Sequence, residues 1–106
     1  GEHMLKHIAD GDFREETVRQ PFAQKAPLVL VYVANYEKMQ RLDQDQKIFY
    51  GPADAAFISQ NVYLFCAQET LNTVVLGMIN RQAIQERIGF DGEAQLGQAI
   101  GYPIPR

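Results

Sequence analysis

The feature that most constrains the fold is an apolar segment that follows Gly51-Pro52. Gly51, Pro52 and Asp54 have the composition of a helix start, with glycine at the cap, proline at the first helical position and an acid in the first turn. At about 100° per residue, the apolar side chains that follow cover more than half of the helix circumference. These side chains are Phe57, Ile58, Val62, Tyr63, Leu64, Phe65, Cys66 and Ala67. The sequence therefore predicts a helix over residues 53–69 that is sandwiched between two layers.

The length of the chain limits what can cover such a helix. At 106 residues the chain is one domain, with little room for a second core. A chain of this size can hardly supply both layers around a helix that is apolar on most of its surface. We therefore expect the second face of the 53–69 helix to be covered by another subunit or by a segment outside this chain.

Several further segments have the patterns of strands and loops. The run from Leu28 to Ala34 is β-branched and aromatic and is apolar at every position, which predicts a central strand buried on both faces. A second buried strand is predicted over 73–79, and a last short strand near 96–102. Residues 3–8 alternate weakly and predict a short strand. The polar residues 36–47 predict a surface loop, with room for a helical turn.

Two further helices have capping signals. Asp12, followed three residues later by Glu15, resembles a capping box and predicts a helix over 13–20. Asn80 suits the N-cap of a second helix, and Gly89 supplies the left-handed residue that ends it. Strands and helices are thus interspersed around one sheet, which is the pattern of an α/β layered fold.

Charge and composition exclude two classes of partner. The formal net charge is -3 and no run of lysine or arginine occurs, whereas nucleic acids and anionic membranes both require a clustered basic face. The longest apolar stretch, residues 28–34, is far shorter than the roughly 20 residues that cross a bilayer. The single cysteine excludes an intrachain disulfide framework, so the cytoplasm is the expected compartment.

The residues that could carry chemistry are few. His3 and His7 have the spacing that begins a metal site on a helix, but no third ligand is identifiable, so no metal is predicted. Cys66 lies among apolar residues without a partner base, which predicts core packing rather than catalysis. Gln60 and Asn61 are amides within the apolar helix. Such groups usually bond to a specific neighbour, and we predict a subunit interface or a missing half of the domain.

Several short strings, in their order and spacing, are similar to the nitroreductase family. None of them is specific by itself, and the resemblance depends on their combination. It extends from about Leu5 to the end of the chain, but it covers only the second half of a typical family member. The strings are Ala9–Arg14, Ala26–Val31, Asp54–Leu64, Thr73–Met78 and Gly101–Pro103.

The resemblance implies a fold and an activity. The fold would be an α/β (α+β) layered fold, present in part, with a mixed sheet and a central buried helix, and residues 1–106 would be the C-terminal portion of one domain. Family members are homodimers, so a dimer through the 53–69 helix is expected. They bind FMN between the subunits and use NAD(P)H to reduce a small-molecule acceptor such as a nitroaromatic or a quinone. The flavin carries this chemistry, which explains why no catalytic residue stands out.

The resemblance also implies cofactor contacts. In the family, backbone amides just after the strand that follows the long helix face the flavin ring, and the matching positions are Leu76, Gly77 and Met78. A glycine at 77 lets the backbone approach a planar ligand closely. A basic residue near the C-terminus binds the flavin phosphate in the family, and Arg106 occupies that place.

Two departures from the family pattern shape the expectations. Glu69-Thr70-Leu71-Asn72 replaces a Gly-Leu-Gly-like turn, and threonine at a left-handed helix stop costs on the order of 1 kcal/mol. The arginine-rich phosphate motif and the ring-contacting asparagine of the family lie in an N-terminal half that this chain does not match. We therefore expect a fragment that cannot complete a flavin site alone. The alternative is a non-catalytic α/β dimerisation or scaffold module that lost the flavin half.

Overall fold

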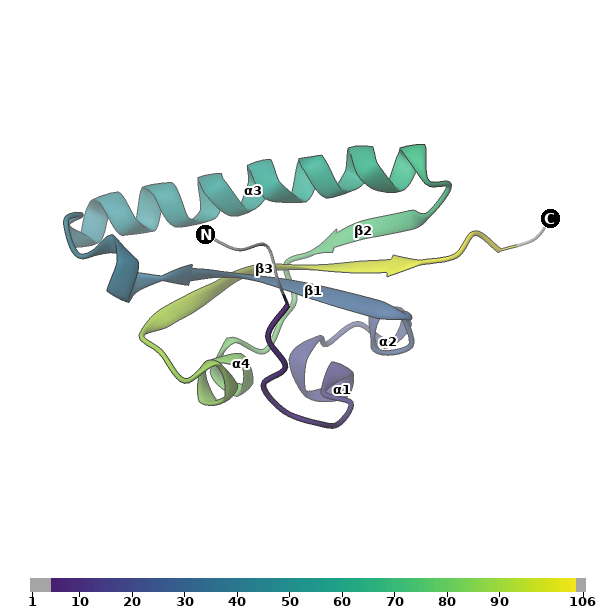
Figure 1. Cartoon of the computed structure of the whole chain (residues 1–106), viewed down its shortest axis with the longest axis horizontal. Helices are drawn as coiled ribbons and strands as arrows, with labels where there is room; N and C mark the ends of the chain where they lie inside the picture. The colour runs from purple at the N-terminus through teal and green to yellow at the C-terminus, as the bar shows by residue number, and fades with distance from the viewer. Residues whose placement is uncertain (1–4, 105–106) are drawn as a thin grey trace.

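The computed structural model describes residues 5–104. These residues form three layers, with one sheet between two layers of helices. Helix α3 lies over one face of the sheet, and the shorter helices lie on the other face (Figure 1). The helices are α1 (Arg14–Thr17), α2 (Pro21–Gln24), α3 (Gln44–Gln68) and α4 (Arg81–Ile88), with a 3-10 helix η1 (Tyr36–Met39). The strands are β1 (Leu28–Asn35), β2 (Asn72–Leu76) and β3 (Gly92–Gly101). The predicted α/β layering is thereby confirmed.

The sheet has three strands in the order β1-β3-β2, and both pairings are antiparallel. The prediction of a mixed sheet is therefore wrong for residues 5–104. The strand predicted over residues 28–34 forms, but β1 lies at an edge and is half-buried rather than central and buried on both faces. The central strand is β3, because its small side chains leave room for helices on both faces. Its small buried residues are Gly92, Ala94, Gly97 and Ala99.

The boundaries of the other two strands also differ from the prediction. β2 ends at Leu76, so the strand predicted over 73–79 is too long. The chain turns away after Leu76, and Ile79 forms an isolated antiparallel bridge with Val18. β3 begins at Gly92, earlier than the predicted start near residue 96, because it pairs along the whole of β1.

Helix α3 begins before the expected Gly51-Pro52 start, because a complete capping box lies upstream. The Asp43 carboxylate accepts a hydrogen bond from the Gln46 N–H at 2.8 Å, and the Gln46 side chain accepts one from the Asp43 N–H at 3.0 Å. Pro52 lies inside the helix at an exposed position, where water can bond the carbonyl group that proline leaves free. The predicted surface loop is correspondingly shorter and contains η1.

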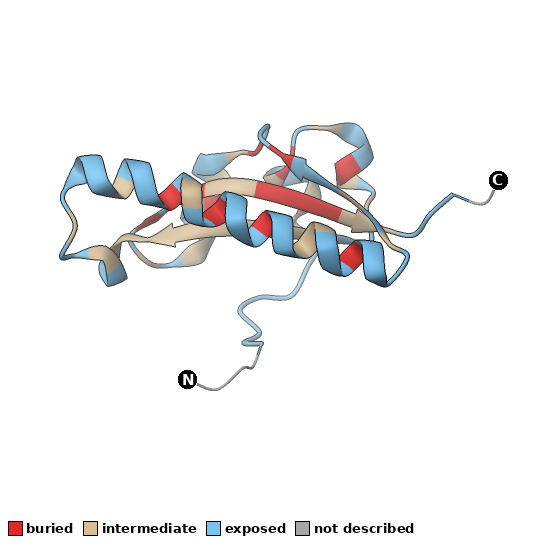
Figure 2. Cartoon of the chain, turned by 90° about the horizontal axis from the view of Figure 1, so that it is seen from above, coloured by how far each residue is buried: buried red, intermediate tan, exposed pale blue. Residues whose placement is uncertain are grey.

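The face of α3 that packs on the sheet consists of small residues, which allow the helix backbone to approach the strands closely. The buried residues of the helix are Gly51, Ala55, Ser59 and Cys66, and they recur along one side of it (Figure 2). The predicted packing of Cys66 in the core is confirmed. Large side chains point outward, and Phe57 and Leu64 are 74% and 61% exposed. Residues 5–104 therefore cover only one face of helix α3. The wide apolar surface of the helix had predicted that this chain would leave the second face uncovered.

Although α3 has 25 residues, no helix in the described part of the chain combines the length and hydropathy needed to cross a membrane.

The N-terminal part of the chain differs most from the prediction. The helix predicted over 13–20 ends at Thr17, because Val18 adopts an extended conformation and bridges to the segment after β2. The described part of the predicted 3–8 strand has no regular structure and is exposed. Residues 3 and 4 of that segment lie outside the described residues.

The predicted capping box at Asp12 and Glu15 does not form. The Asp12 carboxylate instead lies 2.5 Å from the Arg14 guanidinium, which also donates to the Ala26 carbonyl oxygen at 2.6 Å. The hydrogen bond from the Arg14 side chain lowers the pKa of Asp12 to about 2. Asp12 therefore stabilises the position of Arg14 and does not cap a helix. Arg14 in turn connects α1 to the segment that precedes β1.

Both ends of α4 are as predicted. The Asn80 side chain accepts a hydrogen bond from the Ala83 N–H at 3.1 Å, which is the N-cap geometry. Gly89 has a φ of 74°, the left-handed conformation that ends the helix. These local signals were sufficient because capping involves only residues adjacent in sequence.

Threonine occupies the left-handed position at the C-terminal end of α3. Thr70 has a φ of 58°, and the following Leu71 N–H donates to the Cys66 carbonyl oxygen at 2.8 Å. This is the long hydrogen bond of the Schellman motif, in which the left-handed residue is usually glycine. The left-handed stop therefore forms at Thr70, although the cost of threonine in this conformation argued against it in the sequence.

Thr70→Gly is expected to raise the free energy of unfolding by about 0.5–1 kcal/mol, because it removes the contact between a β-branched side chain and its own backbone. Thermal denaturation would detect this as a higher Tm. Gln68→Gly is the matched control, since that residue is helical and exposed, and glycine there should cost about 1 kcal/mol. If both substitutions lower the Tm equally, Thr70 is not strained.

Candidate functional site

Three of the predicted cofactor contacts lie where β2 leads into α4. We call residues 76–80 the β2–α4 turn. Leu76 is buried in the core and anchors the turn to the sheet. Gly77 and Met78 are exposed. The turn therefore presents its backbone at the surface from a fixed base.

The backbone of the β2–α4 turn is bonded to the segment that follows α1. The Arg19 N–H donates to the Met78 carbonyl oxygen at 3.1 Å, and the Asn80 N–H donates to the Thr17 carbonyl oxygen at 2.8 Å. These two bonds flank the bridge that joins the same two segments. The segment after α1, which lies roughly 60 positions earlier in the sequence, thus sets the course of the turn.

Two neighbouring N–H groups of the turn remain available. The Gly77 carbonyl oxygen accepts a bond from the Ile79 N–H at 3.1 Å. Within residues 5–104, however, no acceptor is bonded to the N–H of Gly77 or of Met78. A Cβ atom placed on Gly77 would meet no atom within 4 Å, so the space beside this backbone is open. A flat ligand can therefore approach the backbone at Gly77.

This arrangement suits a planar ring that carries hydrogen-bond acceptors along one edge. The φ of Gly77 lies outside the left-handed region, so its backbone conformation does not require glycine. A ligand that contacts the backbone closely would require it, because any side chain would occupy the ligand's place. An isoalloxazine ring has carbonyl oxygens and ring nitrogens that accept hydrogen bonds, so the residues present fit a flavin. Fixed backbone donors of this kind stabilise negative charge on a bound ring without reorganisation.

Beneath α3, the sheet contains a buried polar cluster that sequence reasoning missed. Gln98 in β3 is fully buried, and its side-chain oxygen accepts a hydrogen bond from the Tyr32 hydroxyl. Its amide nitrogen donates to Thr73 Oγ1 at 3.0 Å and to the Ser59 carbonyl oxygen at 3.5 Å. Burial raises the pKa of Tyr32, so its hydroxyl stays protonated and can donate. The cluster connects all three strands with α3, and its role is structural.

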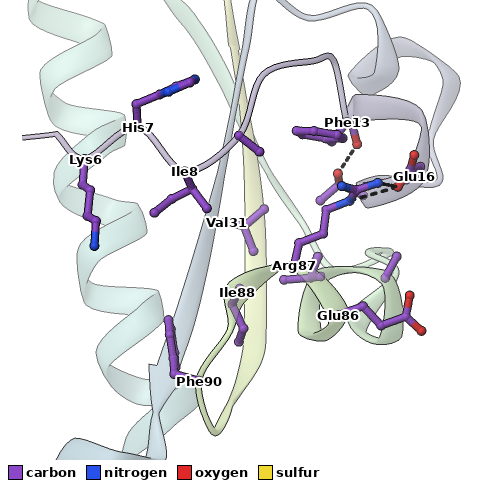
Figure 3. Close-up of a pocket in the computed structure, with 14 residues that line it drawn as sticks. Lys6, His7, Ile8, Phe13, Glu16, Val31, Glu86, Arg87, Ile88 and Phe90 are labelled. Carbon is purple, nitrogen blue, oxygen red and sulfur yellow. Dashed lines mark hydrogen bonds and ion pairs between the residues drawn. The ribbon is translucent and has the colours of Figure 1, made fainter.

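A cavity of about 600 Å³ lies between the N-terminal segment, α1, β1 and α4 (Figure 3). Val31 and Ile88 contribute to its apolar lining. Arg87 forms an ion pair with Glu16 at 2.6 Å and lies over the Phe13 ring at 3.9 Å from its centroid. Arg87 and Glu16 are thus engaged with each other, and the β2–α4 turn does not contribute to the lining of the cavity. The cavity and the candidate site are separate places.

None of the other predicted residues within 5–104 lies in the β2–α4 turn. Arg106 and His3 lie outside the described residues. His7 Nε2 lies 2.9 Å from the carboxylate of Asp10. No group of three histidine, cysteine, aspartate or glutamate side chains among residues 5–104 could hold a metal ion. The Gln60-Asn61 pair is exposed on α3, where the predicted interface partner remains a prediction.

Comparisons with known proteins agree on one family. The model of the nitroreductase family matches residues 2–102. A protein of Methanocaldococcus jannaschii named as a candidate nitroreductase is 32% identical over an alignment of 106 positions, which covers 96% of this chain and 54% of that protein. The crystal structure of a candidate nitroreductase from Ralstonia eutropha JMP134 has a TM-score of 0.78 and 35% identity, and the match covers 90% of this chain and 46% of that one. The chain spans about half the length of these relatives.

Proposed function

Because the chain belongs to the nitroreductase family, we propose that it is the C-terminal portion of an FMN-dependent oxidoreductase of nitroreductase type. NAD(P)H would be the electron donor, and a nitroaromatic or quinone-like small molecule would be the acceptor. We also propose a cytoplasmic location, which fits a protein whose one cysteine is free and buried. The family assignment covers the oxidoreductase type, and the electron donor, the acceptor and the cofactor are proposed in addition to it.

The proposal is carried by the N–H groups of Gly77 and Met78, which have no acceptor within residues 5–104, and by the open space beside Gly77. When bound, FMN would supply the two-electron redox chemistry. The N–H groups of Gly77 and Met78 would bind acceptors on its ring and orient it. Buried Leu76 and the bonds to Thr17 and Arg19 would hold these donors in place. A phosphate contact from Arg106 completes the proposal.

We propose that the protein is a homodimer through α3. The outward face of this helix exposes large apolar side chains, and such a surface exceeds what soluble monomers usually leave uncovered. Among these side chains are Phe49, Phe57, Leu64 and Phe65. Sedimentation of the protein as a compact monomer would contradict this proposal.

The same exposed face supports a second candidate function. A chain that keeps the α3 surface and lacks the remaining flavin contacts would serve as a dimerisation or scaffold module without catalysis. The two candidates differ in cofactor content. The protein expressed from its complete gene should be yellow and retain FMN after desalting if it is an oxidoreductase, and colourless if it is a scaffold.

Gly77→Ala tests the proposed cofactor contact directly. The open space around Gly77 allows a methyl group without a clash in the protein, so the Tm should change little. A bound ring would contact that methyl group, and the Kd for FMN is expected to rise about tenfold or more. Fluorescence titration of FMN with the protein from the complete gene measures this change.

Gly89→Ala is the control for that substitution. Gly89 also has open space around it, but its φ of +74° makes any side chain strained. The control should therefore lower the Tm and leave the Kd for FMN unchanged. An unchanged Kd in Gly77→Ala would remove Gly77 from the proposed site.

A further inference from the structure

A tyrosine of α3 is hydrogen-bonded to the backbone just before the β2–α4 turn. The Val75 N–H donates to the Tyr63 hydroxyl oxygen at 2.7 Å. Val75 pairs with Gln98 across the sheet, and β2 is an edge strand. Because the N–H of Val75 bonds to the tyrosine, it is directed away from β3 and across the free edge of β2.

This bond completes the set of contacts that hold the turn. On the downstream side, the Met78 carbonyl and the Asn80 N–H are bonded to the segment after α1. On the upstream side, Tyr63 holds the backbone two residues before Gly77. The two free N–H groups lie between these two points of attachment. Of the side chains on α3, Tyr63 is therefore placed to set the direction in which those groups point.

We propose that Tyr63 is a positioning residue for the cofactor-facing N–H groups of Gly77 and Met78. This inference rests on the proposed function, since it assigns Tyr63 a role at the same site. The hydroxyl oxygen touches no cofactor and acts through Val75. Its effect depends on direction, because a hydrogen bond weakens steeply as donor and acceptor lose alignment.

The substitution Tyr63→Phe separates positioning from stability. Phenylalanine keeps the aromatic ring and removes only the hydroxyl group. Val75 is 38% exposed, so water can bond its N–H after the substitution and the fold should persist. Tyr50→Phe is the matched control, because Tyr50 lies on the same helix and its hydroxyl bonds to no group among residues 5–104.

The experiment combines two measurements on the protein from the complete gene. Amide hydrogen exchange, followed by NMR without FMN, should show Val75 exchanging about tenfold faster in Tyr63→Phe, while the amides of β3 keep their rates. With FMN, the affinity should fall about fivefold to tenfold, which corresponds to the loss of one hydrogen bond. The midpoint potential of bound FMN should also shift, by about 30 mV for each tenfold difference in affinity between its two redox states. Tyr50→Phe should change none of these.

Three results would overturn the inference. Unchanged exchange at Val75 would show that the hydrogen bond does not hold the strand edge. Faster exchange with unchanged FMN affinity and potential would show that Tyr63 does not position the donors, while the proposed function stands. A wild-type protein that binds no FMN would overturn the proposed function, and the inference would fail with it.

Discussion

Gly92→Ala is expected to destabilise the protein more than the same substitution at any other glycine among residues 5–104. A Cβ atom at this position would lie 2.4 Å from the Ala34 carbonyl oxygen and 3.0 Å from the Phe90 ring. The first of these atoms belongs to the backbone of β1 and cannot rotate away. Gly92 is also the residue at which β3 begins to pair with Asn35. The end of the β1–β3 ladder must therefore open to admit the methyl group.

The expected loss is about 3 kcal/mol, at the upper end of what overpacking costs, because a strand rather than a side chain has to move. For a domain of this size, such a loss lowers the Tm by roughly 10 °C or more. Urea or thermal denaturation at a fixed protein concentration measures it. Gly77→Ala is the matched control, since the same methyl group meets no atom there. If the Tm of Gly92→Ala lies within two or three degrees of the control (~0.5 kcal/mol), the backbone of β1 can move away from the methyl group at little cost.

Gln98→Ala is expected to produce the second large loss. The Gln98 side chain is fully buried and bonds to the Tyr32 hydroxyl, to Thr73 Oγ1 and to a carbonyl of α3. Truncation leaves a cavity between α3 and the sheet. It also leaves polar groups without partners in a place that water reaches poorly. Together these effects should cost about 2–4 kcal/mol.

A matched substitution and a double mutant identify the source of that loss. Gln82→Ala makes the same chemical change at an exposed position of α4 and should alter stability by less than about 0.5 kcal/mol. Tyr32→Phe removes the hydroxyl that Gln98 binds. In urea denaturation, the double mutant should lose about 1 kcal/mol less than the sum of the single losses, because the shared bond is counted once. Strict additivity would mean that the two side chains do not stabilise each other.

The sequence by itself determined the features that depend on neighbouring residues. The β-branched run of β1, the N-cap Asn80 and the left-handed Gly89 were all predicted and all found. The apolar circumference of α3 also predicted that one chain would leave part of the helix uncovered. The order of several short strings indicated the nitroreductase family, which the family model then showed. The local error at Pro52 arose because a stronger cap, Asp43 with Gln46, lay upstream.

The tertiary structure alone decided the features that depend on pairing between distant segments. An apolar run does not reveal its place in a sheet, so β1 was expected at the centre and lies at an edge, while the small residues of β3 occupy the centre. The Gln98 cluster, the bond from Tyr63 to β2 and the attachment of the β2–α4 turn to the segment after α1 each join residues far apart in the chain. The resemblance indicated that Gly77 would face a ligand. Within residues 5–104, the N–H of Gly77 has no acceptor and the space beside it is open. Both properties depend on which distant groups the fold places near this glycine. Such proximity is set by packing of the whole chain, which no local pattern encodes.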